Sequence, residues 1–328
     1  MDRNLTNNVT KWFMVSVLAL ITLIAIGTGQ GRAQEKYPSR GITLICPQTT
    51  GATDLSPRAM LPFLQKKFGV PVNVVNKPGG NSIPAQLELY SAPPDGYTLL
   101  ADAQPFTSLL PLIVKDVPFK IMDRSFIAVT TFGPGLVIVP ANSPYKTLAD
   151  LIADVKKDPG NFTWAGQGGI GGSDYHARRF LKSVGVDVTK TKQVMTKGGA
   201  EGAAMVAGGH VKTTCSAFPS AIPHLNAGTV RALAVLSVKR DEMFPNVPSM
   251  GELGYPNVPS FWMGVSGPPK LPASIVELWD RTIREMHKDP EYLGRLKNLG
   301  LRPMYLDAAE MRELVLKDMR EAQETYSK

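Results

Sequence analysis

The sequence predicts an α/β fold of two lobes, each an open sheet with helices on both faces. Runs rich in β-branched residues alternate with helical patterns along the chain, which is typical of such sheets. The 328-residue chain is also longer than a single core comfortably accommodates. Two breaker-rich segments, 132–136 and 255–259, interrupt it. A crossing between lobes at each would place 34–134 and 258–328 in a discontinuous first lobe and 135–257 in the second.

The composition excludes several classes of protein. Hydrophobic residues make up 43% of the chain and charged residues 20%, an ordinary globular balance that argues against wholesale disorder. Two cysteines are too few for a disulfide-rich scaffold or a four-thiolate zinc site. The formal net charge is +8, but the lysines and arginines are scattered rather than gathered in blocks. We therefore expect diffuse attraction for anions and no nucleic-acid partner.

The first 33 residues have the pattern of a secretory signal peptide. Arg3 and Lys11 precede an uncharged apolar run of 15 residues, 12–26, and small residues follow at Gly31 and Ala33. A membrane anchor is the alternative, but the run is shorter than the roughly 20 residues of a spanning helix. We expect cleavage near Ala33 and export of the mature chain to the periplasm.

Strands and helices follow from the periodicity of apolar residues. Short β-rich runs predict strands at 42–47, 72–76, 97–102, 126–132, 136–140, 162–165, 193–195, 211–217 and 230–237. Helical spacing predicts helices at 55–68, 147–157, 174–184 and 200–207, one that opens near 274 and one that runs from 308. Pro57 falls in the first turn of the first helix, where proline is tolerated. Thr147 with Asp150, and Ser274 with Glu277, resemble capping boxes.

Three corners share one local design, in which a strand is followed by a glycine- or hydroxyl-rich turn and a helix start: 47–54, 165–173 and 196–200. A helix start carries unpaired N–H groups and about half a positive charge, and glycine lets a ligand approach the backbone closely. In open α/β sheets such corners lie at the carboxyl ends of the strands, where ligands bind. They therefore predict a site for carboxylate or phosphate. The alternative is that the turns only connect elements, and that Thr53 and Ser173 only cap helices.

Catalytic motifs are scarce. The chain has four histidines but no His-Glu-x-x-His, Gly-x-Ser-x-Gly or Walker A sequence. Gly166-Gln-Gly-Gly-Ile-Gly matches a dinucleotide-binding pattern, but an exported protein rarely meets NAD. We expect no enzyme activity, no metal and no cofactor. Cys46 and Cys215 are expected as buried free thiols, since a disulfide between the lobes would restrict their closure.

A series of short motifs, taken in order, is similar to that of a known family. The series runs Tyr37-Pro-Ser-Arg-Gly-Ile-Thr-Leu-Ile, Asn76-Lys-Pro-Gly-Gly, Pro93-Pro-Asp-Gly-Tyr-Thr-Leu-Leu, Gly171-Gly-Ser-Asp-Tyr-His, Phe218-Pro-Ser-Ala-Ile-Pro-His, Val230-Arg-Ala-Leu-Ala-Val and Phe244-Pro-Asn-Val-Pro-Ser. It spans the mature chain and resembles the periplasmic solute-binding receptors of tripartite tricarboxylate transporters, the Bug-type receptors. The resemblance implies two lobes of periplasmic-binding-protein type that close on a small carboxylate. It also implies handover to a membrane carrier of large and small subunits.

Several positions depart from the pattern of this family. Gln48 stands where an aromatic residue is usual, and Met195-Thr196 replaces a Pro-Tyr pair. Ser216 and Lys212 stand where aspartates are common, which makes the second lobe less negative. The resemblance therefore does not carry over a particular ligand.

Together these observations predict a non-catalytic receptor, expected as a monomer, that binds a small organic carboxylate in a cleft between its lobes. The ligand is a di- or tricarboxylate or an aromatic acid, and it is delivered to the membrane carrier. One alternative is the same fold serving a sensor kinase, and a less favoured one is an exported enzyme. The predicted ligand-binding residues come from both lobes: Gln48, Thr49, Thr53, Asp54, Gln104, Thr107, Gly168, Gly169, Ser173, His176, Thr196 and Phe218.

Some of these residues have competing roles. Asp54 either caps its helix or pairs with a ligand donor or a water. His176 is expected as a structural group or a ligand hydrogen-bond donor rather than a base. Phe106 and Phe218 either sandwich an aromatic acid or pack near the hinge. Backbone N–H groups are expected to hold one carboxylate, with bridging waters where direct contact fails.

Overall fold

A computed structural model describes residues 37–49, 51–168, 171–255 and 261–326. The chain forms two units, Met1–Ser39 and Arg40–Lys328, and every helix and strand named below belongs to the second unit. The predicted signal peptide, 1–33, lies outside the described residues. Within the described ranges, no helix combines the length and the apolar character needed to cross a bilayer.

The first lobe is built on a six-stranded mixed sheet in the order β11-β4-β10-β3-β1-β2. Its strands are β1 (Ile42–Cys46), β2 (Val72–Asn76), β3 (Thr98–Ala103), β4 (Ser125–Phe132), β10 (Trp262–Gly267) and β11 (Arg302–Leu306). β1 pairs in parallel with β2 and β3. β10 runs antiparallel to β3 and β4, and β11 antiparallel to β4. The sequence patterns missed β10 and β11, because two glycines interrupt the first and a proline the second.

The second lobe is built on a five-stranded sheet in the order β7-β6-β8-β5-β9. Its strands are β5 (Gly135–Pro140), β6 (Thr163–Gly166), β7 (Lys192–Met195), β8 (Thr213–Ala217) and β9 (Val230–Leu236). β6 pairs in parallel with β7 and β8, whereas β5 is antiparallel to β8 and β9. Each of these strands corresponds to a predicted one within two residues at either end.

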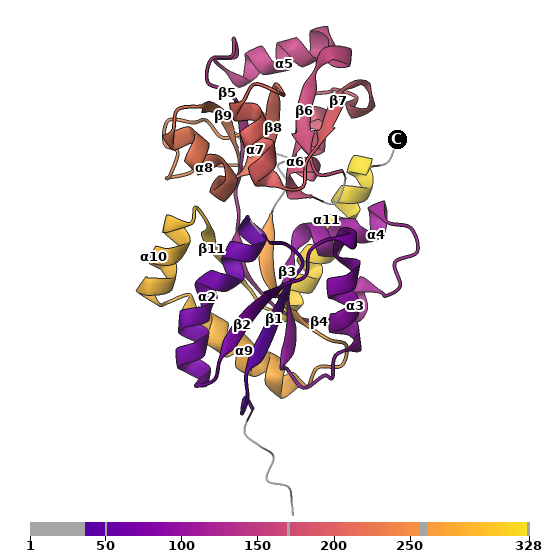
Figure 1. Cartoon of the computed structure of the whole chain (residues 1–328), viewed down its shortest axis with the longest axis vertical. Coiled ribbons are helices and arrows are strands. Elements are labelled where there is room, and N and C mark those ends of the chain that lie inside the picture. Colours follow the sequence, from indigo (N-terminus) through magenta and orange to yellow (C-terminus); the bar gives the residue numbers. More distant parts are fainter. Residues whose placement is uncertain (1–36, 50, 169–170, 256–260, 327–328) are drawn as a thin grey trace, which may run out of the picture. The chain divides into compact units, whose positions relative to one another are not determined.

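Helices pack against both sheets (Figure 1), which confirms the predicted two-lobe α/β class. Those of the first lobe are α2 (Ala52–Phe68), α3 (Ile83–Ser91), α4 (Leu110–Ile113), α9 (Ala273–Met286), α10 (Pro290–Asn298) and α11 (Ala308–Tyr326). Those of the second lobe are α5 (Leu148–Lys157), α6 (Gly172–Ser183), α7 (Gly199–Ala207) and α8 (Phe218–Asn226). Short turns complete the fold: η1 (Gly80–Ser82), η2 (Pro105–Leu109), η3 (Ile121–Asp123), η4 (Pro159–Asn161) and η5 (Val188–Lys190).

The first helix begins earlier than predicted. α2 starts at Ala52 instead of at 55, so Pro57 lies inside the helix and not in its first turn. A proline there has no N–H to donate to the carbonyl of Thr53. The Cys46 thiol contacts that carbonyl instead, at 3.6 Å. A side chain from the neighbouring strand thus replaces the hydrogen bond that the proline removes.

One of the two predicted capping boxes is confirmed. Thr147 and Asp150 exchange hydrogen bonds at the start of α5, at 3.3 and 2.8 Å. The box predicted at Ser274 and Glu277 is wrong. α9 begins at Ala273 directly after Pro272, which serves as its N-cap without a side-chain hydrogen bond, and Ser274 already lies inside the helix.

Both cysteines are free and buried, as predicted. Cys46 ends β1 in the first lobe, and Cys215 lies in β8 of the second. Burial raises the pKa of Cys46 to about 11 and that of Cys215 still further. Both thiols are therefore protonated and unreactive at neutral pH.

Three segments link the lobes. The chain crosses from β4 to β5 at 132–135 and returns between β9 and β10. Most of the second breaker-rich segment, 255–259, lies outside the described residues. The sequence did not predict the third link. α11 packs on β4 of the first lobe, and its last turns contact α6 of the second, where Arg179 pairs with Glu321 at 3.4 Å (Figure 1). The lobe boundaries at 134 and 257 stay a prediction.

Candidate ligand-binding site

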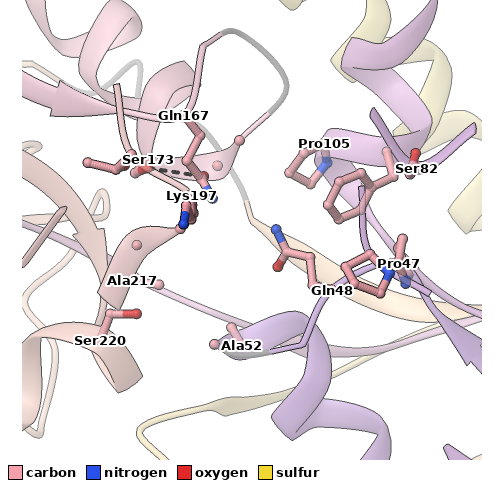
Figure 2. Close-up of a pocket in the computed structure, with 18 of the residues that line it drawn as sticks. Pro47, Gln48, Ala52, Ser82, Pro105, Gln167, Ser173, Lys197, Ala217 and Ser220 are labelled. Atoms are coloured by element: carbon pink, nitrogen blue, oxygen red, sulfur yellow. Dashed lines mark hydrogen bonds between the residues drawn. The ribbon is translucent and has the colours of Figure 1, made fainter. Parts of the chain in front are cut away.

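A cavity of about 300 Å³ lies between the two lobes. Figure 2 shows its two sides. The first lobe contributes Pro47, Gln48, Ala52, Ser82 and Pro105. Opposite them, the second lobe contributes Gln167, Ser173, Lys197, Ala217 and Ser220. Phe106 and Phe261 add apolar surface to its lining.

Five helices begin at this pocket. Its lining includes the first residue, or the residue just before it, of each of α2, α3, α6, α7 and α8. In the described part of the chain, none of these five starts has a side-chain hydrogen bond at its N-cap. Among helices whose starts are not in this lining, side chains of Thr147 and Asp289 cap α5 and α10, whereas α4 and α9 also lack a side-chain cap. The five starts thus bring the partial positive charge of five helix N-termini to one cavity.

The charge of the lining agrees with this arrangement. No acidic residue is among the described residues that line the pocket, and Lys197 is the one cation among them. Two acids in the first turns of helices that begin here, Asp54 of α2 and Asp174 of α6, pair with arginines of their own helices. A third, Glu201 of α7, accepts a hydrogen bond from the backbone N–H of Lys197 at 2.7 Å. The site therefore suits an anion and disfavours a cation.

Five predicted residues line the pocket: Gln48, Thr49, Ser173, His176 and Thr196. Six others are not among its lining: Thr53, Asp54, Gln104, Thr107, Gly168 and Phe218. Gly169 lies outside the described residues. That any of these residues binds a ligand stays a prediction.

The five of these residues that have a side chain are all buried. Thr53 and Gln104 are buried, and their polar atoms have no partner among the described residues. The Thr107 hydroxyl donates to Asp102 in a buried cluster. Phe218 packs edge-to-face on Phe244 in the core of the second lobe, with ring centroids 4.5 Å apart. For Phe218 this is the packing role predicted as the alternative to a sandwich with Phe106.

Asp54 and Gly168 contribute to the corners without lining the pocket. Asp54 does not cap α2, whose N-cap is Gly51. Instead its carboxylate accepts hydrogen bonds from Arg58 at 2.9 Å and from Asn76 at 2.6 Å. The N–H of Gly168 donates to Asp174 at 3.1 Å, so it does not point at a ligand.

Ser173 does not cap α6, contrary to one predicted role. Gly171 is the N-cap, and Ser173 is the second residue of the helix. Its hydroxyl lies 3.1 Å from the side-chain oxygen of Gln167, to which it donates (Figure 2). Both residues line the pocket, so this hydrogen bond orients two polar groups of the second lobe toward it.

His176 is buried and has no hydrogen-bond partner for either ring nitrogen among the described residues. Burial, helped by the nearby positive charge of Arg179, lowers the pKa of its imidazole to about 4. The ring is therefore neutral at pH 7 and offers one N–H donor to the cavity it lines. Its edge meets the ring of Phe261, with centroids 5.9 Å apart.

The sequence patterns missed several lining residues: Asn81, Ser82, Gln167, Lys197, Ser220 and Phe261. The first two belong to a fourth strand–glycine–helix corner, between β2 and α3. Ser220 belongs to a fifth, between β8 and α8, where a proline replaces the glycines. The rule that selected three corners would have found the fourth. It required a glycine- or hydroxyl-rich turn and therefore excluded the fifth, where α8 follows β8 directly.

Comparison with known proteins agrees with this architecture. The tripartite tricarboxylate transporter family receptor matches residues 58–325. The chain is 30% identical over 300 residues to a UPF0065 protein in the gbd 5' region of Cupriavidus necator, which covers 90% of this chain and 89% of that protein. It is also 30% identical over 281 residues to BugT of Bordetella pertussis, which covers 83% and 84%.

Two solved structures are similar in fold. The R. palustris protein Rpa4515 with adipate superposes with a TM-score of 0.80 at 24% identity and covers 88% of this chain and 98% of that one. MatC from Rhodopseudomonas palustris with bound malate gives a TM-score of 0.77 at 22% identity, over 89% and 100%. The family match spans most of the chain, and two relatives are 30% identical to it over nearly its whole length. The chain therefore belongs to the tripartite tricarboxylate transporter receptor family, as a solute-binding receptor of the Bug type.

Proposed function

We propose that this receptor captures a small organic carboxylate in the pocket between its lobes and delivers it to the membrane subunits of a tripartite carrier. The observation that carries the proposal is the convergence of five uncapped helix starts on a cavity with no acidic residue among its described lining. Helix N-termini stabilise anions through free N–H groups and the helix dipole. The chain binds and releases this acid without chemical change.

His176 supports the same proposal independently. It is a buried polar side chain that lines the cavity and has no hydrogen-bond partner within the described ranges, and burying such a group is costly unless a ligand or water bonds to it. A carboxylate oxygen is a suitable acceptor for its N–H. The solved structures of similar fold with malate and adipate are consistent with an acid of this size.

The ligand is a di- or tricarboxylate or an aromatic acid, and the lining is compatible with either. Lys197 is a cation that a second carboxylate would pair with, whereas Phe106 and Phe261 offer rings on which an aromatic acid would pack. A thermal-shift panel of malate, adipate, citrate and benzoate distinguishes these classes. The matched controls are neutral carboxamides such as adipamide and benzamide, which keep the shape of the acid and remove its charge.

We expect at least one acid to raise the melting temperature and its amide to leave it unchanged. An acid at 100 times its Kd stabilises the folded state by about 2.7 kcal/mol. Mass spectrometry of ligand released from the purified protein identifies an acid outside the panel. A protein that releases no acid and responds to no acid, or responds equally to the amides, would contradict the proposal.

The proposal includes export. Residues 1–33 act as a signal peptide that is cleaved near Ala33, and the mature receptor works in the periplasm as a monomer. Intact-mass analysis of periplasmic protein should give a chain that begins near Gln34. A periplasmic chain that retains residues 1–33 would contradict this part of the proposal.

A further inference from the structure

The turn that leads into α3 has an uncommon backbone conformation. Four successive residues have positive φ: Gly79 at 97°, Gly80 at 53°, Asn81 at 54° and Ser82 at 67°. Glycine adopts such angles freely and asparagine tolerates them, but serine does so at a cost in energy. Asn81 and Ser82 both line the pocket. Strained residues of this kind persist only where their surroundings hold them, and they gather at binding sites.

Gln86 holds this turn in place. It lies one helical turn after Ser82 in α3, is fully buried and is not among the residues that line the cavity. Its side-chain amide donates to the Ser82 hydroxyl at 2.9 Å and to the Phe106 carbonyl at 2.8 Å. Phe106 belongs to η2 and also lines the pocket. One amide group therefore joins two separate segments of the first-lobe wall.

The orientation of this amide is set from behind by a buried ion pair. The Gln86 oxygen accepts a hydrogen bond from Arg124 at 2.5 Å. Arg124 in turn pairs with Asp102 at 2.9 Å, and both of these side chains are fully buried. Because a guanidinium can only donate, it requires the oxygen of Gln86 to face it. The amide nitrogen must then point at Ser82 and Phe106.

We propose that Gln86 is a positioning residue of the binding site, which fixes Ser82 and the carbonyl of Phe106 in the geometry that the ligand meets. The inference rests on the proposed function in one respect, namely that this pocket is where the receptor binds its acid. Its effect on affinity is indirect, because Gln86 acts through two residues that line the cavity. A preorganised wall lowers the cost of ordering the site on binding.

Hydrogen exchange of the ligand-free protein tests the positioning role directly. The N–H groups of Ser82 and Ile83 are bonded to the carbonyls of Gly79 and Gly80 and report on the turn. In Gln86→Met, which keeps the length of the side chain and removes its polar atoms, we expect these amides to exchange at least about tenfold faster. Amides of β1, in the core of the same lobe, should stay as protected as in the wild type.

Two further variants keep the test decisive. Ser82→Ala removes the hydrogen bond from Gln86 to the Ser82 hydroxyl and leaves the Arg124–Gln86 contact intact. It therefore replaces Gln86→Met in this test if Gln86→Met folds poorly. Thr131→Val is the matched control, because it removes another buried hydroxyl contact of the first lobe, with Ser56 at 2.6 Å, away from the pocket lining. We expect the control to leave exchange at 82 and 83 unchanged. Wild-type protection in Gln86→Met, or faster exchange spread evenly over the lobe, would overturn the proposal.

Calorimetry with adipate and with malate measures the consequence for binding. Gln86→Met and Ser82→Ala should each bind these acids about tenfold more weakly than the wild type, while Thr131→Val binds normally. Loss of protection with unchanged affinity would overturn the role in binding. If the wild type binds neither acid, that result bears on the proposed function, and the exchange data still decide the role of Gln86.

Discussion

Asp54 and Asp174 hold equivalent positions in the two lobes, each in the first turn of a helix that begins at the pocket. Asp54 pairs with Arg58 at 2.9 Å and Asp174 with Arg178 at 2.5 Å, and each arginine lies four residues further along its helix. Both carboxylates are buried, and neither lines the cavity. Each negative charge is therefore neutralised within its own lobe and does not face a bound anion.

The two carboxylates also hold the loops that precede their helices. The Asn76 amide connects Asp54 to the backbone carbonyl of Gln48. Asp174 accepts directly from the N–H of Gly168, and the Gln193 amide donates to it from the neighbouring strand. Two lobes with different sequences thus use the same combination of an acid, an arginine and a carboxamide to present a pocket loop.

Replacing Asp174 should therefore impair binding and stability together. Asp174→Asn removes the charge that Arg178 pairs with and weakens the acceptor for Gly168. We expect about a tenfold loss of affinity for the bound acid and about 1–3 kcal/mol less free energy of unfolding. Titration calorimetry and urea denaturation measure the two quantities. Glu291→Gln is the control, because it breaks an exposed ion pair with Arg295. We expect it to lower the free energy of unfolding by less than about 0.5 kcal/mol. Normal affinity in Asp174→Asn would show that this loop does not form the site.

A branched side chain at the start of α7 should block the site without harming the fold. Gly198 lines the pocket, has an extended φ of −175°, and has room for a Cβ, with Gln167 as the nearest neighbour at 3.8 Å. Gly198→Val should therefore fold normally but obstruct the approach to the helix N-terminus, with at least about a tenfold loss of affinity. Gly41→Val, outside the pocket lining and also with room for a Cβ, should bind as the wild type. Equal affinity in both variants would exclude the start of α7 from the site.

His176 should make stability depend on pH in a defined window. The pKa of the imidazole is 6.5 in its ordinary state and about 4 in the folded protein. Between these values the unfolded chain binds more protons, so the free energy of unfolding falls as the pH is lowered from 6.5 toward 4. The loss reaches about 3 kcal/mol at most.

The comparison of wild type with His176→Gln isolates this contribution. His287 also has a lowered pKa because of burial, and it contributes in the same direction to both proteins. Urea denaturation at pH 7 and pH 4.5 should show a smaller pH effect in His176→Gln. The same pH dependence in both proteins would mean that His176 is not held neutral in the folded state.

Ser173→Ala distinguishes a ligand contact from a structural role. The hydroxyl does not cap α6, so we expect the melting temperature to change little. If the hydroxyl contacts a charged ligand oxygen, its removal should cost roughly 1.5–3 kcal/mol of binding free energy. Gln167→Leu removes its partner and should produce a similar, non-additive loss, because the two side chains form one hydrogen-bonded pair. Additive losses would show that they act separately.

Much of the architecture could be predicted from local sequence patterns. The strand runs and the Thr147–Asp150 capping box were identified correctly, because they depend on residues close together in the chain. β10 was missed because two glycines interrupt its Trp-Met-Gly-Val-Ser-Gly sequence. It also has no alternation, since it is buried on both faces in the middle of the sheet. The contact of α11 with α6 depends on tertiary packing that no local pattern encodes.

The sequence predicted three of the strand–turn–helix corners that form the pocket, but only some of the residues that line it. A strand–turn–helix pattern identifies the loop, but it does not show which way a side chain points. Thr107 and Phe218 lie close to the pocket along the chain, yet the first faces Asp102 and the second faces Phe244. Conversely, Phe261 lines the cavity from the segment that returns to the first lobe, far along the chain from the predicted corner of that lobe at 47–54.

Ligand binding should bring the two lobes together. The pocket lining comes from both lobes, so an acid that contacts both stabilises the closed arrangement by its differential affinity for that state. The two chain crossings and α11 limit the motion to a hinge, and the Arg179–Glu321 contact at 3.4 Å lies on the third link. Small-angle scattering should give a smaller radius of gyration with a saturating acid than with its neutral amide. An unchanged radius of gyration, with binding confirmed by calorimetry, would show that the site is preformed or confined to one lobe.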